Sequence, residues 1–277
     1  MKTISLLAIL LLAAVSAANA ASDYKIDWYS INSGGGIASS ASYNANTTIG
    51  QPTAGFASST SFLHWIGFWA GDVPTPTVVP SIDAAKALPD DTCVSIAGRL
   101  ATTSATDFSF FFYIEERDRH SGIRVATPGG PIAGLARGSV VNVIGTMGTT
   151  SDGERVLTGP IVVIMYTDTP LGPLGMPNRS LGGGNSPVGQ IGVKGGKGLN
   201  NVGLLVTTWG QVTALAGSDM LITDGSGDSV RVNVAGLAAL PGVSDYVSVI
   251  GICSLTTSGP DKLPYVLPRT RPDIRAY

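Results

Sequence analysis

The residues best suited to chemistry lie in an aromatic and basic segment near the middle of the chain. Aromatic side chains run from Phe108 to Tyr113, and Arg117, Arg119 and Arg124 follow closely. Aromatic rings stack on nucleic-acid bases, at about 1–3 kcal/mol per base, and arginines contact the phosphates beside them. Aromatic rings also stack on sugars. The segment therefore predicts a surface for a nucleic acid or an oligosaccharide.

Strand alternation divides these side chains between two faces. In a strand, Phe110, Phe112 and Ile114 would share one face, and Phe111, Tyr113 and Glu115 the other. One set must fill a core, which leaves the other set for stacking. The candidate ligand-binding residues are Phe111, Tyr113, Arg117, Arg119 and Arg124.

Acidic residues in the same segment oppose a phosphate ligand. Glu115, Glu116 and Asp118 offset the three arginines, and the formal net charge of the whole chain is −2. A protein that binds a phosphate backbone usually carries a basic surface. We therefore do not expect nucleic acid as the main partner.

Signatures of catalysis and metal binding are weak. The two histidines, His64 and His120, form no HExxH motif. The glycine-rich stretch around Lys197 lacks the Ser or Thr that follows the lysine of a P-loop. Three aspartates between residues 219 and 228 lack EF-hand spacing, so a plain hairpin turn is the alternative to a calcium site. We expect no enzyme activity, catalytic residue, metal or cofactor.

An internal repeat indicates which elements hold these residues. Residues 93–166 and 203–275 carry the same succession of valine-rich segments and glycines, and each copy predicts five strands. In the first copy, strand one ends at Gly98 and strand four at Gly145. The equivalent glycines of the second copy are Gly210 and Gly251. Glycine marks the bulges and tight bends that a small barrel needs.

Four segments of the first copy form a recognisable series, namely Val94–Gly98, Phe112–Ile114, Gly122–Val125 and Val141–Gly145. The series resembles OB-fold modules of exported bacterial proteins. The resemblance implies a five-stranded Greek-key barrel that binds oligonucleotides or oligosaccharides on its second and third strands. Glu115 stands where these modules usually have Asp, and the second copy lacks the aromatic residues. The predicted fold is all-β, with two tandem OB-like five-stranded barrels.

The first residues predict export. Residues 1–20 have the features of a signal peptide, with Lys2 before an apolar run and Ala18–Ala20 as the cleavage site. We expect the mature chain to lie in the periplasm, on the cell surface or outside the cell. We expect no transmembrane segment in it.

Residues 21–73 predict a small N-terminal β-unit with a turn at Gly34–Gly36. Its predicted strands are Tyr24–Ile31, Ser42–Ile49 and Phe62–Trp69. Within it, Ile49–Gly55 followed by Gly67–Gly71 is similar to a segment at the start of modules in exported bacterial surface proteins.

The remaining divisions follow from the Gly and Pro content. Residues 74–81 predict an extended linker, and 82–169 the first OB-like barrel with a short helix over 82–88. Residues 170–200 form a connector that is either mobile or packed across the junction. Residues 201–277 form the second barrel.

Export would permit a disulfide between Cys93 and Cys253. The strand phase opposes it, because Val94 and Ile96 point inward and Cys93 therefore points outward. Cys253 keeps the inward phase of Val249. Two unpaired cysteines that pack as small apolar residues are the alternative.

These features favour an exported, non-catalytic interaction or scaffold protein, with a surface protein or an oligosaccharide as its partner. The alternative function is a module that binds an oligosaccharide or a single-stranded nucleic acid on the first barrel.

Overall fold

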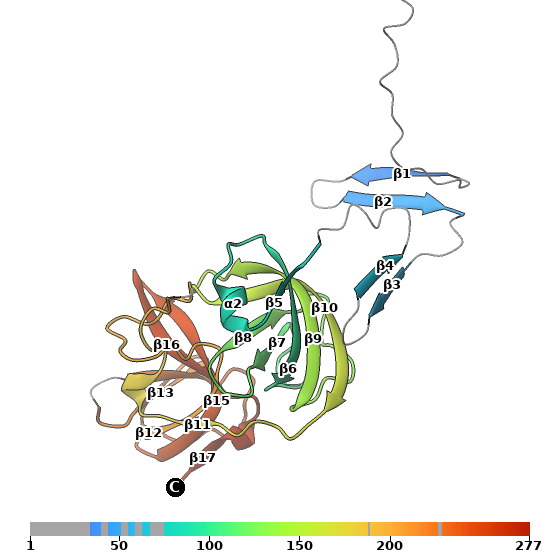
Figure 1. Ribbon diagram of the computed structural model, residues 1–277. Coiled ribbons are helices and arrows are strands. Elements are labelled where there is room, and N and C mark those ends of the chain that lie inside the picture. Colours follow the sequence, from blue (N-terminus) through green and yellow to red (C-terminus); the bar gives the residue numbers. More distant parts are fainter. Residues whose placement is uncertain are drawn as a thin grey trace, which may run out of the picture. The chain divides into compact units, whose positions relative to one another are not determined.

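The chain forms two compact units, Met1–Val73 and Pro74–Tyr277. The computed structural model describes residues 34–39, 44–50, 55–58, 63–66, 75–187, 189–226 and 229–277. The predicted signal peptide over residues 1–20 and the predicted strand Tyr24–Ile31 lie outside these residues. Figure 1 shows the elements in chain order.

The first unit contains two antiparallel strand pairs. Strand β1 (Gly34–Ser39) pairs with β2 (Asn44–Ile49), and β3 (Gly55–Ser58) pairs with β4 (Leu63–Ile66). Strands β2 and β4 fall within two of the predicted strands. The turn predicted at Gly34–Gly36 is wrong, because these glycines begin β1, and β3 was not predicted.

The second unit begins with a closed barrel. Five strands lie in the order β6-β7-β8-β10-β9, and β6 also pairs with β9, which closes the ring. Strand β8 runs parallel to β10, whereas the other pairs of the ring are antiparallel. This is the Greek-key order of the OB-fold, as predicted. The strands are β6 (Cys93–Ala101), β7 (Phe111–Glu115), β8 (Gly122–Ala126), β9 (Ser139–Thr149) and β10 (Arg155–Thr167).

Part of the predicted linker belongs to this barrel. Strand β5 (Thr77–Val79) pairs in parallel with β6, so residues 74–81 are not only a spacer. Helix α2 (Ile82–Lys86) follows within the segment predicted as helical. It begins at Ser81, whose hydroxyl accepts a hydrogen bond from the backbone N–H of Ala84 at 3.1 Å and so caps the helix.

A second barrel repeats the same strand order. Its ring is β12-β13-β14-β16-β15, closed by pairing of β12 with β15, and β14 runs parallel to β16. Two short strands extend the sheet beyond the ring: β11 pairs with β12, and β17 pairs with β15 (Figure 1). The strands are β11 (Leu174–Gly175), β12 (Leu205–Ala216), β13 (Asp219–Thr223), β14 (Ser229–Asn233), β15 (Tyr246–Ser258), β16 (Asp261–Leu267) and β17 (Ile274–Ala276).

The predicted strand ends at glycines are wrong, since these glycines lie inside longer strands. Strand β6 continues past Gly98 to Ala101, and the pairing register with β9 shifts between Ile96 and Arg99. Gly98 has a φ of 73°, a left-handed conformation that glycine adopts without strain. The glycine therefore forms a bulge that bends a continuous strand around the barrel.

Each barrel fills its own core with side chains from alternating strand positions. Val94 and Ile96 are buried in the first core, and Cys253 is buried in the second. Cys93 is half-buried, and both cysteines are unpaired, as the strand phase favoured. Burial raises the pKa of Cys253 to about 12, so its thiol stays neutral and packs as an apolar group.

The connector is packed across the junction between the barrels. Strand β11 pairs with β12, a short 3-10 helix (Asn178–Ser180) follows, and Leu181 lies in the second core. Gln190 accepts a hydrogen bond at 2.9 Å from the backbone N–H of Arg155 in the first barrel. Of the two alternatives for the connector, packing is therefore confirmed.

Candidate functional site

The predicted ligand face lies on β7, where side chains alternate as expected. Phe112 and Ile114 are buried in the core of the first barrel, whereas Tyr113 belongs to a different cluster on the outer face. Phe110 does not join the inward set, because it lies before the strand and is exposed. The prediction that Phe110 shares the face of Phe112 and Ile114 is therefore wrong.

The second barrel covers this outer face. Tyr113 packs with Leu205, Ile252 and Leu267 of the second barrel in a separate apolar cluster. The Tyr113 side chain has no exposed surface. The prediction that Tyr113 stacks on a ligand is therefore corrected, because its ring already packs against apolar side chains of the neighbouring barrel.

A buried polar group completes the contact around Tyr113. Its hydroxyl donates a hydrogen bond at 2.8 Å to Glu154, and the hydroxyl of Ser254 in the second barrel donates to the other carboxylate oxygen at 2.8 Å. Arg124 approaches the same carboxylate at 3.5 Å. Burial raises the pKa of Glu154, an effect that these three partners partly oppose.

A second buried carboxylate fixes the two barrels together. Glu115 accepts a hydrogen bond from the backbone N–H of Leu205 at 3.0 Å and pairs with Arg119. Arg119 also donates to the carbonyl of Leu205 at 2.9 Å and to that of Gly172. The predicted ligand residue Arg119 therefore uses its donors within the protein. Burial raises the pKa of Glu115 against the opposing effect of Arg119.

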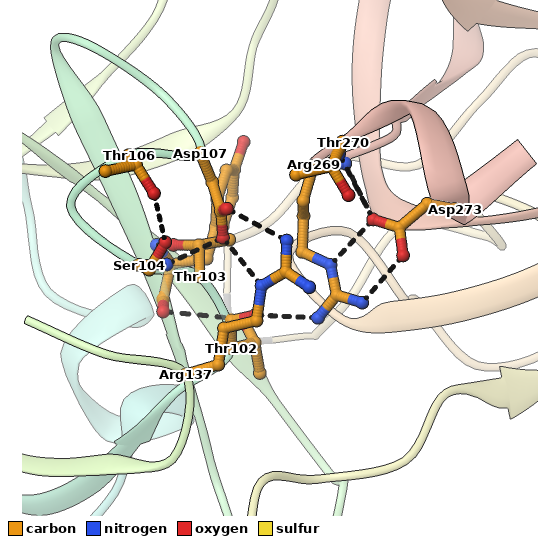
Figure 2. Close-up of polar contacts among 10 residues, drawn as sticks. Thr102, Thr103, Ser104, Thr106, Asp107, Arg137, Arg269, Thr270 and Asp273 are labelled. Atoms are coloured by element: carbon orange, nitrogen blue, oxygen red, sulfur yellow. Dashed lines mark hydrogen bonds and ion pairs between the residues drawn. The ribbon is translucent and has the colours of Figure 1, made fainter.

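Polar contacts continue along the junction. Figure 2 shows the guanidinium of Arg269, in the second barrel, forming two bonds to Asp273 and one, at 3.0 Å, to the carbonyl of Thr102 in the first barrel. Beside it, Arg137 pairs with Asp107 through two bonds of 2.9 Å (Figure 2). Arg269 thus links the first barrel to the C-terminal part of the second, whereas Arg137 pairs within the first barrel.

The other predicted residues are less enclosed. The guanidinium of Arg124 lies 3.7 Å from the ring centroid of Phe111, and Phe111 stacks on Phe108 at 4.7 Å. Arg117 is exposed and pairs with Asp168. The structure thus brings Phe111, Tyr113 and Arg124 together, places Arg119 at the adjoining Glu115 contact, and leaves Arg117 outside the junction.

An exposed aromatic surface on the second barrel was not predicted from the sequence. It consists of Trp209, Tyr246 and Tyr277, whose exposed fractions are 49%, 61% and 83%. Trp209 pairs with Ser248, which lies two residues from Tyr246 on the same face of β15. The hydroxyl of Tyr277 lies 3.2 Å from that of Ser248. We call these three residues the aromatic surface.

No cluster of three or more potential metal ligands occurs in the described part of the chain. Asp219 accepts a hydrogen bond from Tyr265, and Asp224 accepts one from the backbone N–H of Asn178, while Asp228 lies outside the described residues. No helix among the described ranges is long and apolar enough to span a membrane.

Comparisons with known proteins give no family. No family model matches the chain, and neither does any curated protein. A murine DNA-binding protein, solved with double-stranded DNA, aligns at 9% identity over 67% of this chain and 97% of that chain, with a TM-score of 0.34. A multidomain protein with nucleic-acid-binding domains from Streptococcus pneumoniae aligns at 12% identity over 64% of this chain and 45% of that chain, with a TM-score of 0.17.

Proposed function

We propose that this chain is an exported, non-catalytic interaction protein in which the two barrels act as one rigid module. The observation that carries the proposal is the burial of Tyr113 and Glu115 against the second barrel. An OB-fold commonly presents this face to a ligand. Here the same face holds two domains in a fixed arrangement, which suits a scaffold.

The junction is too polar and too enclosed to open at little cost. Separating the barrels would expose the apolar cluster around Tyr113 and break the bonds of Glu154 to Ser254 and of Glu115 to Leu205. A buried polar group left without its partner costs about 1–3 kcal/mol. A ligand of the first barrel would have to replace these contacts.

A partner protein would instead bind the aromatic surface of the second barrel. Tyrosine, tryptophan and arginine carry much of the binding energy of protein interfaces. Trp209, Tyr246 and Tyr277 are accompanied by the exposed Arg275, which pairs in register with Ser248 on the neighbouring strand. This composition suits a surface protein better than a phosphate-bearing ligand.

Site-specific photo-crosslinking on intact cells of the producing organism tests the proposal. A photoreactive residue at Trp209 should form protein adducts, and one at the exposed Thr158 of the first barrel should not. In the same preparation, mass spectrometry should find a mature chain that begins after Ala20. The proposal is wrong if the purified protein binds an oligosaccharide or oligonucleotide and Phe111→Ala abolishes that binding.

A further inference from the structure

A pocket of about 240 Å³ lies beside helix α2. Asp83 and Lys86 of the helix, His120 and Ser121 before β8, and Leu199 of the connector contribute to its lining. Pockets for drug-sized ligands usually measure about 300–1,000 Å³. This one therefore suits a smaller molecule.

Lys86 is the unusual member of the lining. Only 4% of the residue is exposed, and its ammonium donates a hydrogen bond to the carbonyl of Val202 at 3.1 Å. Among the described residues, no carboxylate oxygen lies within 4.0 Å of the Lys86 ammonium nitrogen, so Lys86 forms no ion pair with them. Buried lysines are almost always paired with a negative charge. An ammonium carries three donors, so two remain for a ligand.

The surrounding charges leave this ammonium incompletely neutralised. Asp83, on the same helix, is engaged by Nε2 of His120 at 3.1 Å. Glu154, just before β10, and Arg155, its first residue, act on Lys86 with opposite signs, and Cys253 also interacts with it. Burial outweighs these charges and lowers the pKa of Lys86 to about 8.

We propose that this pocket binds a small monocarboxylate whose carboxylate group pairs with Lys86. One unpaired ammonium matches one negative charge. A doubly charged phosphate would meet Asp83 in the same pocket without a second buried cation to offset it. Ser121 and Asn185 offer polar groups to hydroxyls of the ligand, and Leu199 gives an apolar edge. The inference is independent of the partner proposed for the aromatic surface.

NMR of the full mature chain with lysine labelled at Cε tests the site directly. Acetate, L-lactate and D-gluconate are titrated against D-glucose and inorganic phosphate. At least one carboxylate should shift the Lys86 signal saturably and raise the pKa of Lys86, whereas glucose and phosphate should not. The proposal fails if no carboxylate gives a saturable shift, or if phosphate does so equally.

Variants separate the pocket from general effects. Lys86→Met should abolish the binding seen by calorimetry, and Lys194→Met should retain it, because Lys194 is exposed and pairs with Asp261 at 2.6 Å. Leu199→Trp keeps the ammonium but narrows the pocket at a side chain that is 83% exposed, so binding should weaken at least about tenfold without a change in melting temperature. Unchanged affinity in Leu199→Trp would overturn the proposal even if Lys86→Met failed to fold.

Discussion

The carboxylate of Glu115, on the outer face of the first barrel, accepts a hydrogen bond at 3.0 Å from the backbone N–H of Leu205 in the second. Both residues are buried, and Leu205 is the first residue of β12. A side chain at the ligand face of one barrel thus fixes the starting point of the other.

Close backbone approach should make Gly122 intolerant of a side chain. A Cβ at this position would overlap the carbonyl oxygen of Gly203, whereas one at Gly129 would meet nothing within 4 Å. Gly122→Ala should lower the free energy of unfolding by about 1–3 kcal/mol or more, because neither backbone can move aside freely. Gly129→Ala is the control and should change it little. Urea unfolding measures both, and equal stability of the two variants would contradict the packing described.

The hydroxyl of Tyr113 should contribute to stability and not to ligand binding. Tyr113→Phe keeps the ring but leaves an oxygen of the buried Glu154 without its donor. We expect a loss of about 1–3 kcal/mol in the free energy of unfolding. Phe110→Ala removes an exposed ring and should cost much less. If Tyr113→Phe has the same free energy of unfolding as the wild type, the hydroxyl of Tyr113 faces solvent and does not bond to Glu154.

Glu154 should make stability depend on pH. Because burial raises its pKa above the ordinary 4.5, the folded chain keeps this proton where the unfolded chain has released it. Its contribution is complete below pH 4.5 and is lost as the pH rises through the raised pKa. The unfolding free energy of the wild type minus that of Glu154→Gln should therefore fall as the pH rises above 4.5, by at most about 1.4 kcal/mol per pH unit. A difference that rises with pH would contradict the burial of this carboxyl.

Lys86 should change the pH dependence of stability in the opposite direction to Glu154. Its pKa falls from 10.5 to about 8 in the folded chain, so below pH 8 the buried charge opposes folding. The cost disappears as the pH rises from about 8 to 10.5. The unfolding free energy of the wild type minus that of Lys86→Met should increase over this range by up to about 3 kcal/mol. Taking the difference between the two proteins removes the pH dependence that Cys253 and the tyrosines contribute to both. A flat difference would mean that Lys86 is solvated.

The sequence pattern predicted the barrels because short stretches of sequence determine the inward face and the bend of each strand. Alternating Val94 and Ile96 define an inward face, and Gly98 permits the left-handed bend that a closed ring needs. Periodicity also separated Phe112 from Tyr113. It could not say what covers the outer face, since that depends on contacts between residues about a hundred positions apart, such as Glu154 and Ser254.

Other features were missed for similar reasons. Strand β5 lies in a proline-rich stretch and gains its identity only by pairing with β6. Glu154 follows a glycine in a turn, where an acidic residue is normally solvated. Lys86 ends a short helix, a position that is usually exposed, and it is buried only because the connector folds over it.

The central claim, that the second barrel covers the outer face of the first, is tested most directly by amide hydrogen exchange at Leu205. In the wild type, this N–H should exchange within about tenfold of the slowest amides of the two cores, because exchange requires the junction to open. Glu115→Ala should speed exchange at Leu205 and leave the slowest amides of the second barrel nearly unchanged. Exchange of the Leu205 amide at the rate of an unprotected chain in the wild type would contradict the account.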